Sequence, residues 1–563
     1  MSTQISEQSK NTPMKIRWPI FIIPMALIAV TVGINFVSGE AFNALIMAFT
    51  DFTLGSFGWL FSVMTTLVVV LIAIAYFSPF GNVRLGGSKA KPIMRQSSYV
   101  WIVLCTILAA GILLWACAEP MYHYFAPPTH IQPESPDAIT FMMENIFLEW
   151  TFTPMCIYGV PAILFAFCFY NMKRENSVGS MLYPALSDKT SRFLAPAVDV
   201  ICVFALVIGM AASMGSAVFL IAEGTSSMTG GAVKSEPVTW VIVATVIVAA
   251  FVASAIAGIM KGIRMLADFN SRLYIALGVF VLIFGPTFYV LDLTVETFGA
   301  YISDFFQMSL FISAADGDGW AKWWPVFYWC NWLAWMPVTS VFLGRISRGY
   351  SVREAIKVIV VVPALISVAW MGLFSGTAIN FELAGLGINK AMQESGTAAA
   401  TYAVFENLPI PVITIPAFLL VVLVSFVTGA DANTNALGGL CTSGDPGDDA
   451  ESPTWLKIVW GATIGVVCVV FVLAFQTTDA LKYESNLAGF AVVFLLVIFC
   501  ISFIKVMRNP AKYDTRKEDY DENGKPIPSK RLPSEEEETA KPTLWMKLRG
   551  KTGEPEKESQ LVG

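Results

Sequence analysis

Long apolar segments recur along the chain, separated by short polar ones. Runs of about 18 or more apolar residues have the length that an α-helix needs to cross a bilayer. Backbone N–H and C=O groups find no water in lipid, so each segment is predicted to be a helix. The predicted spans are residues 18–38, 54–77, 98–120, 138–172, 194–223, 238–259, 268–292, 320–345, 353–376, 408–436, 455–477 and 485–507. The pattern predicts an all-α membrane protein with about twelve transmembrane helices.

Lysine and arginine alternate between the predicted loops. The loops after spans 2, 4, 6 and 8 are rich in them, for example Arg84, Lys89 and Arg95 after residue 77, whereas the odd-numbered loops hold at most one cation each. The loop after span 10 is an acidic exception, with Asp448 and Glu451. Cytoplasmic loops retain Lys and Arg. We therefore expect a multi-pass protein of the bacterial inner (plasma) membrane with both termini in the cytoplasm.

Three parts follow from these boundaries. Residues 1–17 are a cytoplasmic N-terminal tail, 18–507 the transmembrane domain and 508–563 a charged cytoplasmic C-terminal tail. The C-terminal tail is acidic and contains several prolines, which favours a solvated, mostly disordered segment, with a regulatory role as the alternative. Residues 294–312 carry apolar positions at helical spacing with interrupting acids, and we interpret them as an amphipathic helix at the membrane interface.

The composition narrows the function classes. The chain is 55% hydrophobic and only 14% charged, whereas a soluble domain carries about 25% charged residues. No basic nucleic-acid patch, C-x-x-C pair or G-x-x-x-x-G-K-[ST] phosphate loop occurs in the sequence. The only histidines, His123 and His130, fall in the predicted external loop after residue 120 with no second ligand at metal spacing. We predict no enzyme, cofactor or metal, which leaves a secondary carrier or a channel.

The span at 320–345 is chemically distinct because tryptophans continue into its middle. Trp329, Trp332 and Trp335 follow one another at three-residue spacing, which predicts one aromatic face. An interfacial belt would stop after about one turn, and packing against lipid is the alternative. Aromatic faces hold cations that have no N–H to donate. The pattern therefore favours a site for a quaternary-ammonium solute.

Further rings come from two other predicted spans. Trp150 and Tyr158 lie in span 138–172, and Glu119-Pro120-Met121-Tyr122 ends the span before it. With Phe327-Tyr328-Trp329 and the run from Arg345 to Gly349, these segments resemble the betaine/carnitine/choline transporter family. The resemblance implies a LeuT-like fold with inverted repeats in spans 3–7 and 8–12, and a homotrimer. The substrate-binding residues that it implies are Tyr122, Trp150, Met155, Tyr158, Trp329, Asn331, Trp332 and Trp335.

The chain departs from that family at two places in the expected cage. Met155 stands where a second tryptophan is usual in span 4, and Asn331 replaces one of two adjacent tryptophans in span 8. A methionine sulfur is polarisable and still contacts a methylammonium group. Asn331 has two open roles, binding a substrate hydroxyl or carboxylate, or bonding a helix carbonyl. The implied substrates are carnitine, γ-butyrobetaine, glycine betaine and choline.

The departures also concern ion coupling. Sodium-coupled relatives resemble one another in a glycine-rich break in span 3 and in hydroxyl side chains of spans 5 and 10. This chain has one glycine left in that part of span 3. It has Met210 in span 5, and Gly429 follows Thr428 in span 10. Hard cations need oxygen ligands. Asn270 stands where sodium-independent carnitine exchangers carry an arginine, so Thr428 and Asn270 mark a cation site or its substitute. We favour sodium-independent exchange; the alternatives are sodium- or proton-coupled symport with osmotic regulation, and a channel or sensor.

Overall fold

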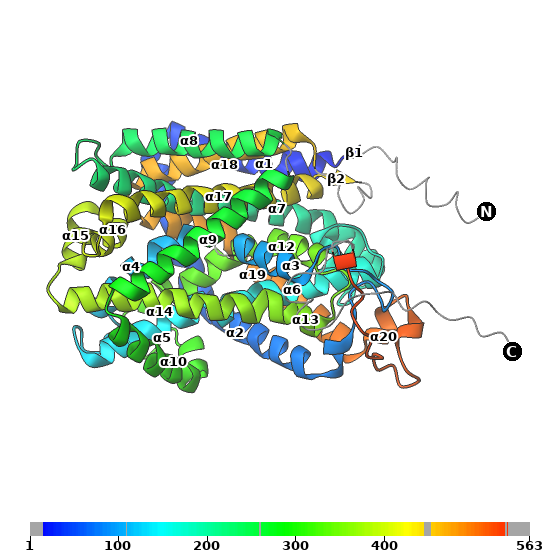
Figure 1. The fold of residues 1–563 in the computed structure, drawn as a ribbon. Helices are drawn as coiled ribbons and strands as arrows, with labels where there is room; N and C mark the ends of the chain where they lie inside the picture. The colour runs from blue at the N-terminus through cyan, green and yellow to red at the C-terminus, as the bar shows by residue number, and fades with distance from the viewer. Residues whose placement is uncertain (1–14, 108–109, 258–259, 444–451, 535–536, 539–563) are drawn as a thin grey trace.

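The computed structural model describes residues 15–107, 110–257, 260–443, 452–534 and 537–538. They form one bundle of helices (Figure 1), with a two-stranded antiparallel sheet of β1 (Lys15–Ile16) and β2 (Thr442–Ser443) at one end. The α-helices are α1 (Trp18–Val37), α2 (Gly39–Phe77), α3 (Gln96–Ile107), α4 (Ala110–Phe125), α5 (Pro136–Trp150), α6 (Phe152–Ala166), α7 (Asp188–Met228), α8 (Pro237–Ala257), α9 (Met260–Phe284), α10 (Thr287–Ser309), α11 (Trp320–Trp323), α12 (Pro325–Ile346), α13 (Val352–Ile356), α14 (Val362–Leu383), α15 (Ile388–Ser395), α16 (Ala399–Glu406), α17 (Pro411–Leu440), α18 (Thr454–Phe475), α19 (Asp479–Arg508) and α20 (Pro510–Tyr513). Single π-helical turns follow α6 (Phe167–Asn171) and precede α14 (Lys357–Val361).

The helices confirm the all-α membrane fold class. Within the described residues, 9 helices are long and apolar enough to cross a membrane, or up to 10 if the bent pair α9–α10 counts as one span. The remaining predicted spans, 98–120 and 320–345, fall on α3 with α4 and on α11 with α12. Twelve as the number of spans therefore remains a prediction.

The seventh predicted span, 268–292, was wrong at its C-terminal end. Helix α9 ends at Phe284, and α10 leaves it at an angle of 107°. Gly285 and Pro286 lie between the two helices. Proline has no N–H to donate and its ring clashes with the preceding turn, while glycine adopts the bend without a side chain to place. The predicted amphipathic helix 294–312 is α10, which begins earlier, and its place at the membrane interface remains a prediction.

Both described ends of the chain lie at the same end of the bundle, as Figure 1 shows. Arg17 before α1 forms an ion pair of 2.9 Å with the buried Asp199 of α7. Ser177, from the loop after the fourth predicted span, donates to the same carboxylate at 2.8 Å. The N-terminal strand β1 pairs with β2 in the loop after α17. The described ends of the chain and the loops after the fourth and tenth predicted spans therefore lie at one end of the bundle.

The C-terminal tail differs from the prediction of a mostly disordered segment, which was wrong for residues 509–534. Asp514 is buried, and its carboxylate accepts hydrogen bonds from the Asn171 amide (2.6 Å) and the Tyr520 hydroxyl (2.9 Å). Asp519 accepts from the backbone N–H of Ser88 at 2.9 Å. Arg84 donates to both the hydroxyl and the carbonyl of Ser529. Apart from Tyr520, these partners lie hundreds of residues away, so the composition of the tail gave no sign of them.

Next to the C-terminal tail, the loop after α2 and the loop after α12 are connected by backbone hydrogen bonds. In the loop after α2, Leu85 donates to Tyr350 O at 3.0 Å and accepts from Gly349 N at 2.8 Å. Val352 N donates to Val83 O at 2.9 Å. Gly349 has φ +79°, and a Cβ there would lie 2.4 Å from Pro92 N, so only glycine fits. The α2–α3 loop and the α12–α13 loop are thereby joined.

Candidate substrate site

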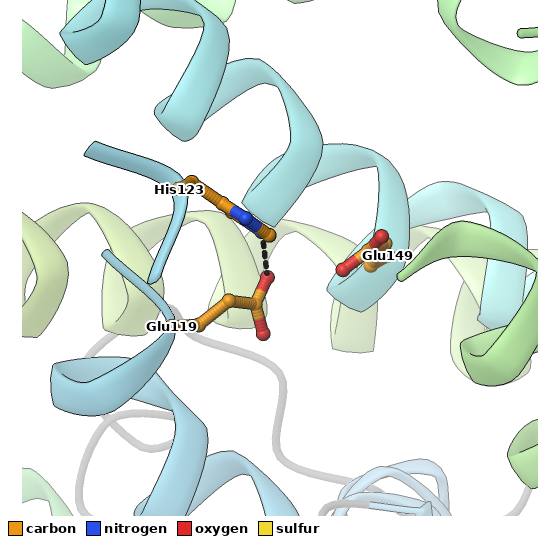
Figure 2. A group of neighbouring side chains, drawn as sticks. All are labelled: Glu119, His123 and Glu149. Carbon is orange, nitrogen blue, oxygen red and sulfur yellow. Dashed lines mark ion pairs between the residues drawn. The ribbon is translucent and has the colours of Figure 1, made fainter. Parts of the chain in front are cut away.

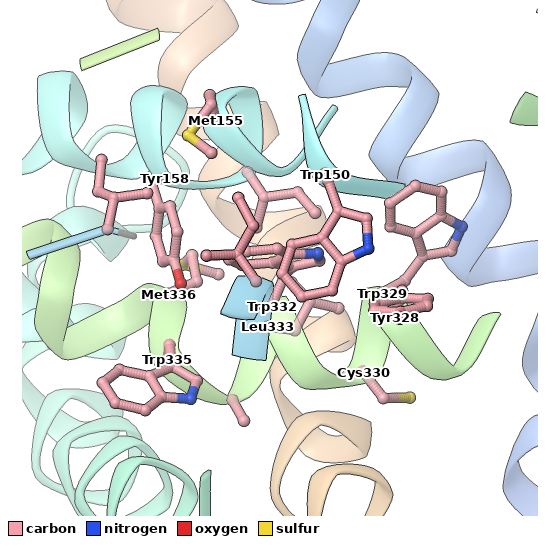
Figure 3. Close-up of a cluster of buried hydrophobic side chains, with 14 of the residues drawn as sticks. Trp150, Met155, Tyr158, Tyr328, Trp329, Cys330, Trp332, Leu333, Trp335 and Met336 are labelled. Atoms are coloured by element: carbon pink, nitrogen blue, oxygen red, sulfur yellow. The ribbon is translucent and has the colours of Figure 1, made fainter. Parts of the chain in front are cut away.

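An aromatic cavity lies where α6 and α12 face each other in the interior of the bundle. Helix α5 ends at Trp150 because the backbone leaves helical values at Thr151 (φ −114°, ψ −110°), and α6 then continues past Tyr158. The Trp332 ring from α12 is edge-on to Trp150 at 5.4 Å and to Tyr158 at 6.0 Å between centroids. Figure 3 shows these rings beside Trp335, all buried. Such edge-to-face pairs stabilise buried rings beyond their area.

The cavity has a volume of about 40 Å³ in this structure. That volume holds a few water molecules at most, whereas ligand pockets measure about 300–1,000 Å³. Trp332 fills much of the space between its two neighbours. Admission of a trimethylammonium group therefore requires the rings to move apart.

Five of the predicted binding residues line this cavity: Trp150, Tyr158, Asn331, Trp332 and Trp335. They come from α5, α6 and α12, so segments far apart in the chain meet as expected. Their role in substrate binding remains a prediction.

The other three predicted binding residues lie outside its lining. Successive residues of an α-helix turn by about 100°, so Trp329 points about 120° away from Trp335. It is fully buried between helices. Met155 is fully buried on α6. The Tyr122 hydroxyl bonds to Thr397 at 2.9 Å.

Several residues of the lining were not among the predicted binding residues. Trp115 of α4 contributes a further tryptophan, and its signal was present: it lies one turn before Glu119 on the same predicted helix. Phe327 belongs to the motif that was noted, but not to the predicted site. No local signal marks the hydroxyls. The polar side chains that complete the lining are Thr106, Ser213, Ser216 and Ser485.

Asn331 has a partner that neither of its two predicted roles includes. Its side-chain oxygen accepts a hydrogen bond of 3.0 Å from the Ser485 hydroxyl on α19. Both side chains line the cavity, so the amide connects α12 to α19 at the edge of the candidate site. Asn331 therefore has two candidate roles, substrate recognition and helix packing. The two roles predict different results when Asn331 is replaced.

We expect Asn331→Ala to weaken the binding of carnitine or glycine betaine more than that of choline. A carboxylate left without its donor in a buried site costs about 1–3 kcal/mol, and choline has no carboxylate. Calorimetric titration of the three ligands measures the difference. Ser485→Ala is the matched control, because it removes the α12–α19 hydrogen bond and leaves the amide in place. An equal loss for all ligands in both variants would assign Asn331 to helix packing.

The two residues of the predicted cation site lie elsewhere. The Asn270 amide on α9 donates to Ser425 on α17 at 2.8 Å, and the Thr428 hydroxyl donates to the carbonyls of Val424 (2.8 Å) and Ser425 (3.2 Å). Asn270 instead lines a largely apolar cavity of about 670 Å³ between α9, α10 and α14. The Asn270–Ser425 bond connects α9 to α17, whereas Arg272 is exposed.

Some residues behind the coupling prediction lie outside the described part of the chain. These are Leu108 and Ala109 of the predicted span 98–120, and the side chain of Asp268.

Figure 2 shows a cluster of two carboxylates and an imidazole. Glu119 and His123 of α4 and Glu149 of α5 are buried, and one ligand atom from each lies within 4.8 Å of the others. The His123 Nε2–Glu119 Oε1 distance is 3.4 Å. The prediction that placed His123 in an external loop without a second ligand was wrong, since α4 continues to Phe125. The four-residue spacing of Glu119 and His123 on one helix face was the available signal.

Hydrogen bonds connect this cluster to the cavity. The Trp150 indole N–H donates to Glu119 Oε2 at 2.9 Å, and the Tyr328 hydroxyl donates to the same oxygen. The Trp332 indole N–H donates to the backbone carbonyl of Glu149 at 2.9 Å. Two of the cavity rings are therefore oriented by the residues of the cluster.

The chain matches a known family over most of its length. A family model described as "BCCT, betaine/carnitine/choline family transporter" matches residues 19–512. The chain is 27% identical to an ectoine/hydroxyectoine transporter of Virgibacillus pantothenticus over 497 residues, 88% of this chain and 97% of that protein. It is 29% identical to glycine betaine transporter 2 of Vibrio parahaemolyticus over 458 residues, 81% of this chain and 83% of that protein. A solved sodium-coupled sialic acid symporter is similar at a TM-score of 0.41 and 12% identity, covering 86% of this chain and 99% of that one.

Proposed function

Because the chain belongs to the betaine/carnitine/choline family of transporters, we propose that it carries glycine betaine or a related quaternary-ammonium solute, namely carnitine, γ-butyrobetaine or choline. The protein is a multi-pass membrane transporter and not an enzyme. The proposal concerns its substrate, its coupling and its assembly.

The aromatic cavity is the observation that carries the substrate class. Trp150, Tyr158 and Trp332 bring three rings from three helices to one point, with Trp335 beside them. A quaternary ammonium group has no N–H to donate, and each ring that it contacts contributes about 0.5–2 kcal/mol by cation–π attraction once water is excluded. The relatives named for glycine betaine support the same class.

For coupling, we propose sodium-independent substrate exchange. Thr428 donates its hydroxyl hydrogen to its own helix, and Asn270 is bonded to Ser425. Gly429 and Met210 contribute no side-chain oxygen. A sodium ion needs several oxygen ligands, and these positions offer few. Sodium- or proton-coupled symport is the alternative.

Counterflow in proteoliposomes tests both parts of the proposal. Vesicles are loaded with unlabelled glycine betaine, and radiolabelled glycine betaine is added outside in potassium buffer or in sodium buffer. We expect uptake of equal rate in both buffers, because exchange needs substrate on both sides and no sodium. Vesicles without internal substrate are the control, and uptake into them would indicate a channel.

Uptake that occurs only with sodium would overturn the exchange proposal. It would restore Thr428 and Asn270 as parts of a cation site. Absence of counterflow with all four solutes would overturn the substrate class itself.

We further propose a location in the bacterial inner membrane with both termini in the cytoplasm, and assembly as a homotrimer. The shared face of the termini and the cation-rich loops supports the orientation. Family membership supports the trimer. Cross-linking in native membranes tests the assembly, and accessibility of the termini in intact spheroplasts tests the orientation.

A further inference from the structure

Glu119 and Glu149 form a buried carboxylate pair inside the bundle. Both side chains have 0% exposure, and an oxygen of each lies within 4.8 Å of the other residue's and of a His123 nitrogen. Burial disfavours a charged carboxylate, and two like charges at this distance disfavour each other further. One of the two groups therefore needs a compensating positive charge.

The two carboxylates have unequal surroundings. Glu119 Oε2 accepts hydrogen bonds from the Trp150 indole and the Tyr328 hydroxyl. Both oxygens of Glu149 and the Nδ1 atom of His123 have no hydrogen-bond partner among the described residues, and His123 Nε2 faces Glu119 Oε1 at 3.4 Å. In Figure 2 the side chains of His123 and Glu149 point into the same space above Glu119. Glu149 and His123 are therefore the part of the cluster that the surrounding hydrogen bonds leave unsatisfied.

The charged and titratable side chains around the cluster determine its net charge. From α19, the Lys482 ammonium lies 4.3 Å from the centre of the Trp324 ring, and that ring lies 4.4 Å from the His123 ring between centroids. From α12 the neighbour is the Tyr328 hydroxyl. From α10, the carboxylate of Asp304 interacts electrostatically with Glu144, which lies five residues before Glu149 on α5.

Two carboxylates, one ammonium and a neutral imidazole leave one excess negative charge. A single proton neutralises the cluster, whereas a divalent cation would leave it positive beside Lys482. The charge balance therefore favours a proton over a metal ion as the occupant.

Two indole groups connect the cluster to the cavity by hydrogen bonds. Trp150 bonds to the Glu119 carboxylate and Trp332 to the Glu149 backbone, and both rings line the cavity. A quaternary ammonium group between these rings brings its own positive charge close to the cluster. That charge compensates the carboxylates in place of the proton.

We propose that Glu149, with Glu119 and His123, binds one proton, which is released to bulk water when a quaternary-ammonium substrate occupies the neighbouring cavity. The linkage rests on the proposed function, because it requires a cationic substrate between Trp150 and Trp332. The proton site itself does not, since it follows from the cluster alone.

Infrared difference spectroscopy of the purified, substrate-free protein tests the proton site. Spectra at pH 6 and pH 9 should contain a band of a protonated buried carboxyl, and Glu149→Gln should remove it. Glu144→Gln is the matched control on the same helix and should keep the band. Loss of the band in neither or in both variants would overturn the site, and so would a stoichiometric divalent metal found by mass spectrometry.

Calorimetric titration with choline and with glycine betaine tests the linkage. In the wild type, affinity should rise with pH, by up to about tenfold per unit for one released proton, and the heat should depend on the ionisation enthalpy of the buffer. Glu149→Gln should bind without either dependence. Should that variant fail to fold, His123→Gln is expected to reduce the same pH dependence.

The outcomes separate the two proposals. Binding that is independent of pH in the wild type overturns the linkage and leaves the proposed function intact. No binding of any quaternary-ammonium solute, with the carboxyl band present, overturns the proposed function and the linkage but not the proton site.

Discussion

Trp332→Ala is expected to abolish measurable binding of glycine betaine while the protein remains folded. Trp332 stands between Trp150 and Tyr158 and contacts both rings edge-on. Its removal deletes one caging ring, a loss of at least about 1–2 kcal/mol, and also the hydrogen bond from its indole N–H to the Glu149 carbonyl. About tenfold or more in affinity is therefore lost. Calorimetric titration measures the affinity, and size-exclusion chromatography in detergent verifies the fold.

Trp329→Ala is the matched control. The two tryptophans lie on the same helix, one turn apart, but Trp329 does not line the cavity and is fully buried. Its truncation should lower thermal stability, since a deleted buried aromatic ring costs about 3–5 kcal/mol, and should leave affinity nearly unchanged. Wild-type affinity of Trp332→Ala, or an equal loss in both variants, would remove the cavity from consideration as the substrate site.

Gly489→Ala is expected to destabilise the protein strongly. Gly489 lies on α19 directly against α12, and a Cβ at this position would lie 2.0 Å from the carbonyl oxygen of Cys330. The backbone of α12 cannot move away locally, because the neighbouring Asn331 is bonded to Ser485 on the same helix pair. Overpacking of this kind costs about 1–3 kcal/mol and occasionally more. The thermal unfolding midpoint in detergent should fall, and affinity should fall with it as Trp332 is displaced.

Gly429→Ala provides the comparison. This glycine of α17 has nothing within 4 Å of its would-be Cβ, and alanine favours a helix over glycine by about 1 kcal/mol. The variant should be as stable as the wild type or slightly more stable. A wild-type unfolding midpoint for Gly489→Ala would mean that α12 and α19 pack more loosely than their contact indicates.

The predictable parts of the fold were those that depend on local composition. Runs of apolar residues gave the helices, because lipid permits few other structures. The end of α9 was also readable, since Gly285-Pro286 is a strong stop signal, but the apolar residues on both sides concealed it. The tail could not be read from its composition, since Asp514 is satisfied by Asn171, which lies far away in the chain.

The residues of the candidate site also fall into two groups, those that the local sequence indicates and those that it does not. Trp150, Tyr158 and Trp332 were identifiable because deep aromatic residues are unusual in a membrane helix, and they line the cavity as a group. Trp329 lies outside the lining of the cavity, and its role in substrate binding stays a prediction. Glu149 and Ser485 could not be identified, because a polar residue in a predicted membrane helix does not indicate which residues of other helices it will meet.

The backbone pairing between Leu85 and the Gly349–Tyr350 turn restricts how the transporter can open. It connects the ends of α2 and α12. At the same place, Arg84 donates a hydrogen bond to Ser529 of the C-terminal tail. We therefore expect the ends of α2 and α12 to stay together when the transporter opens towards this face, so that a gate on this side forms between other helices.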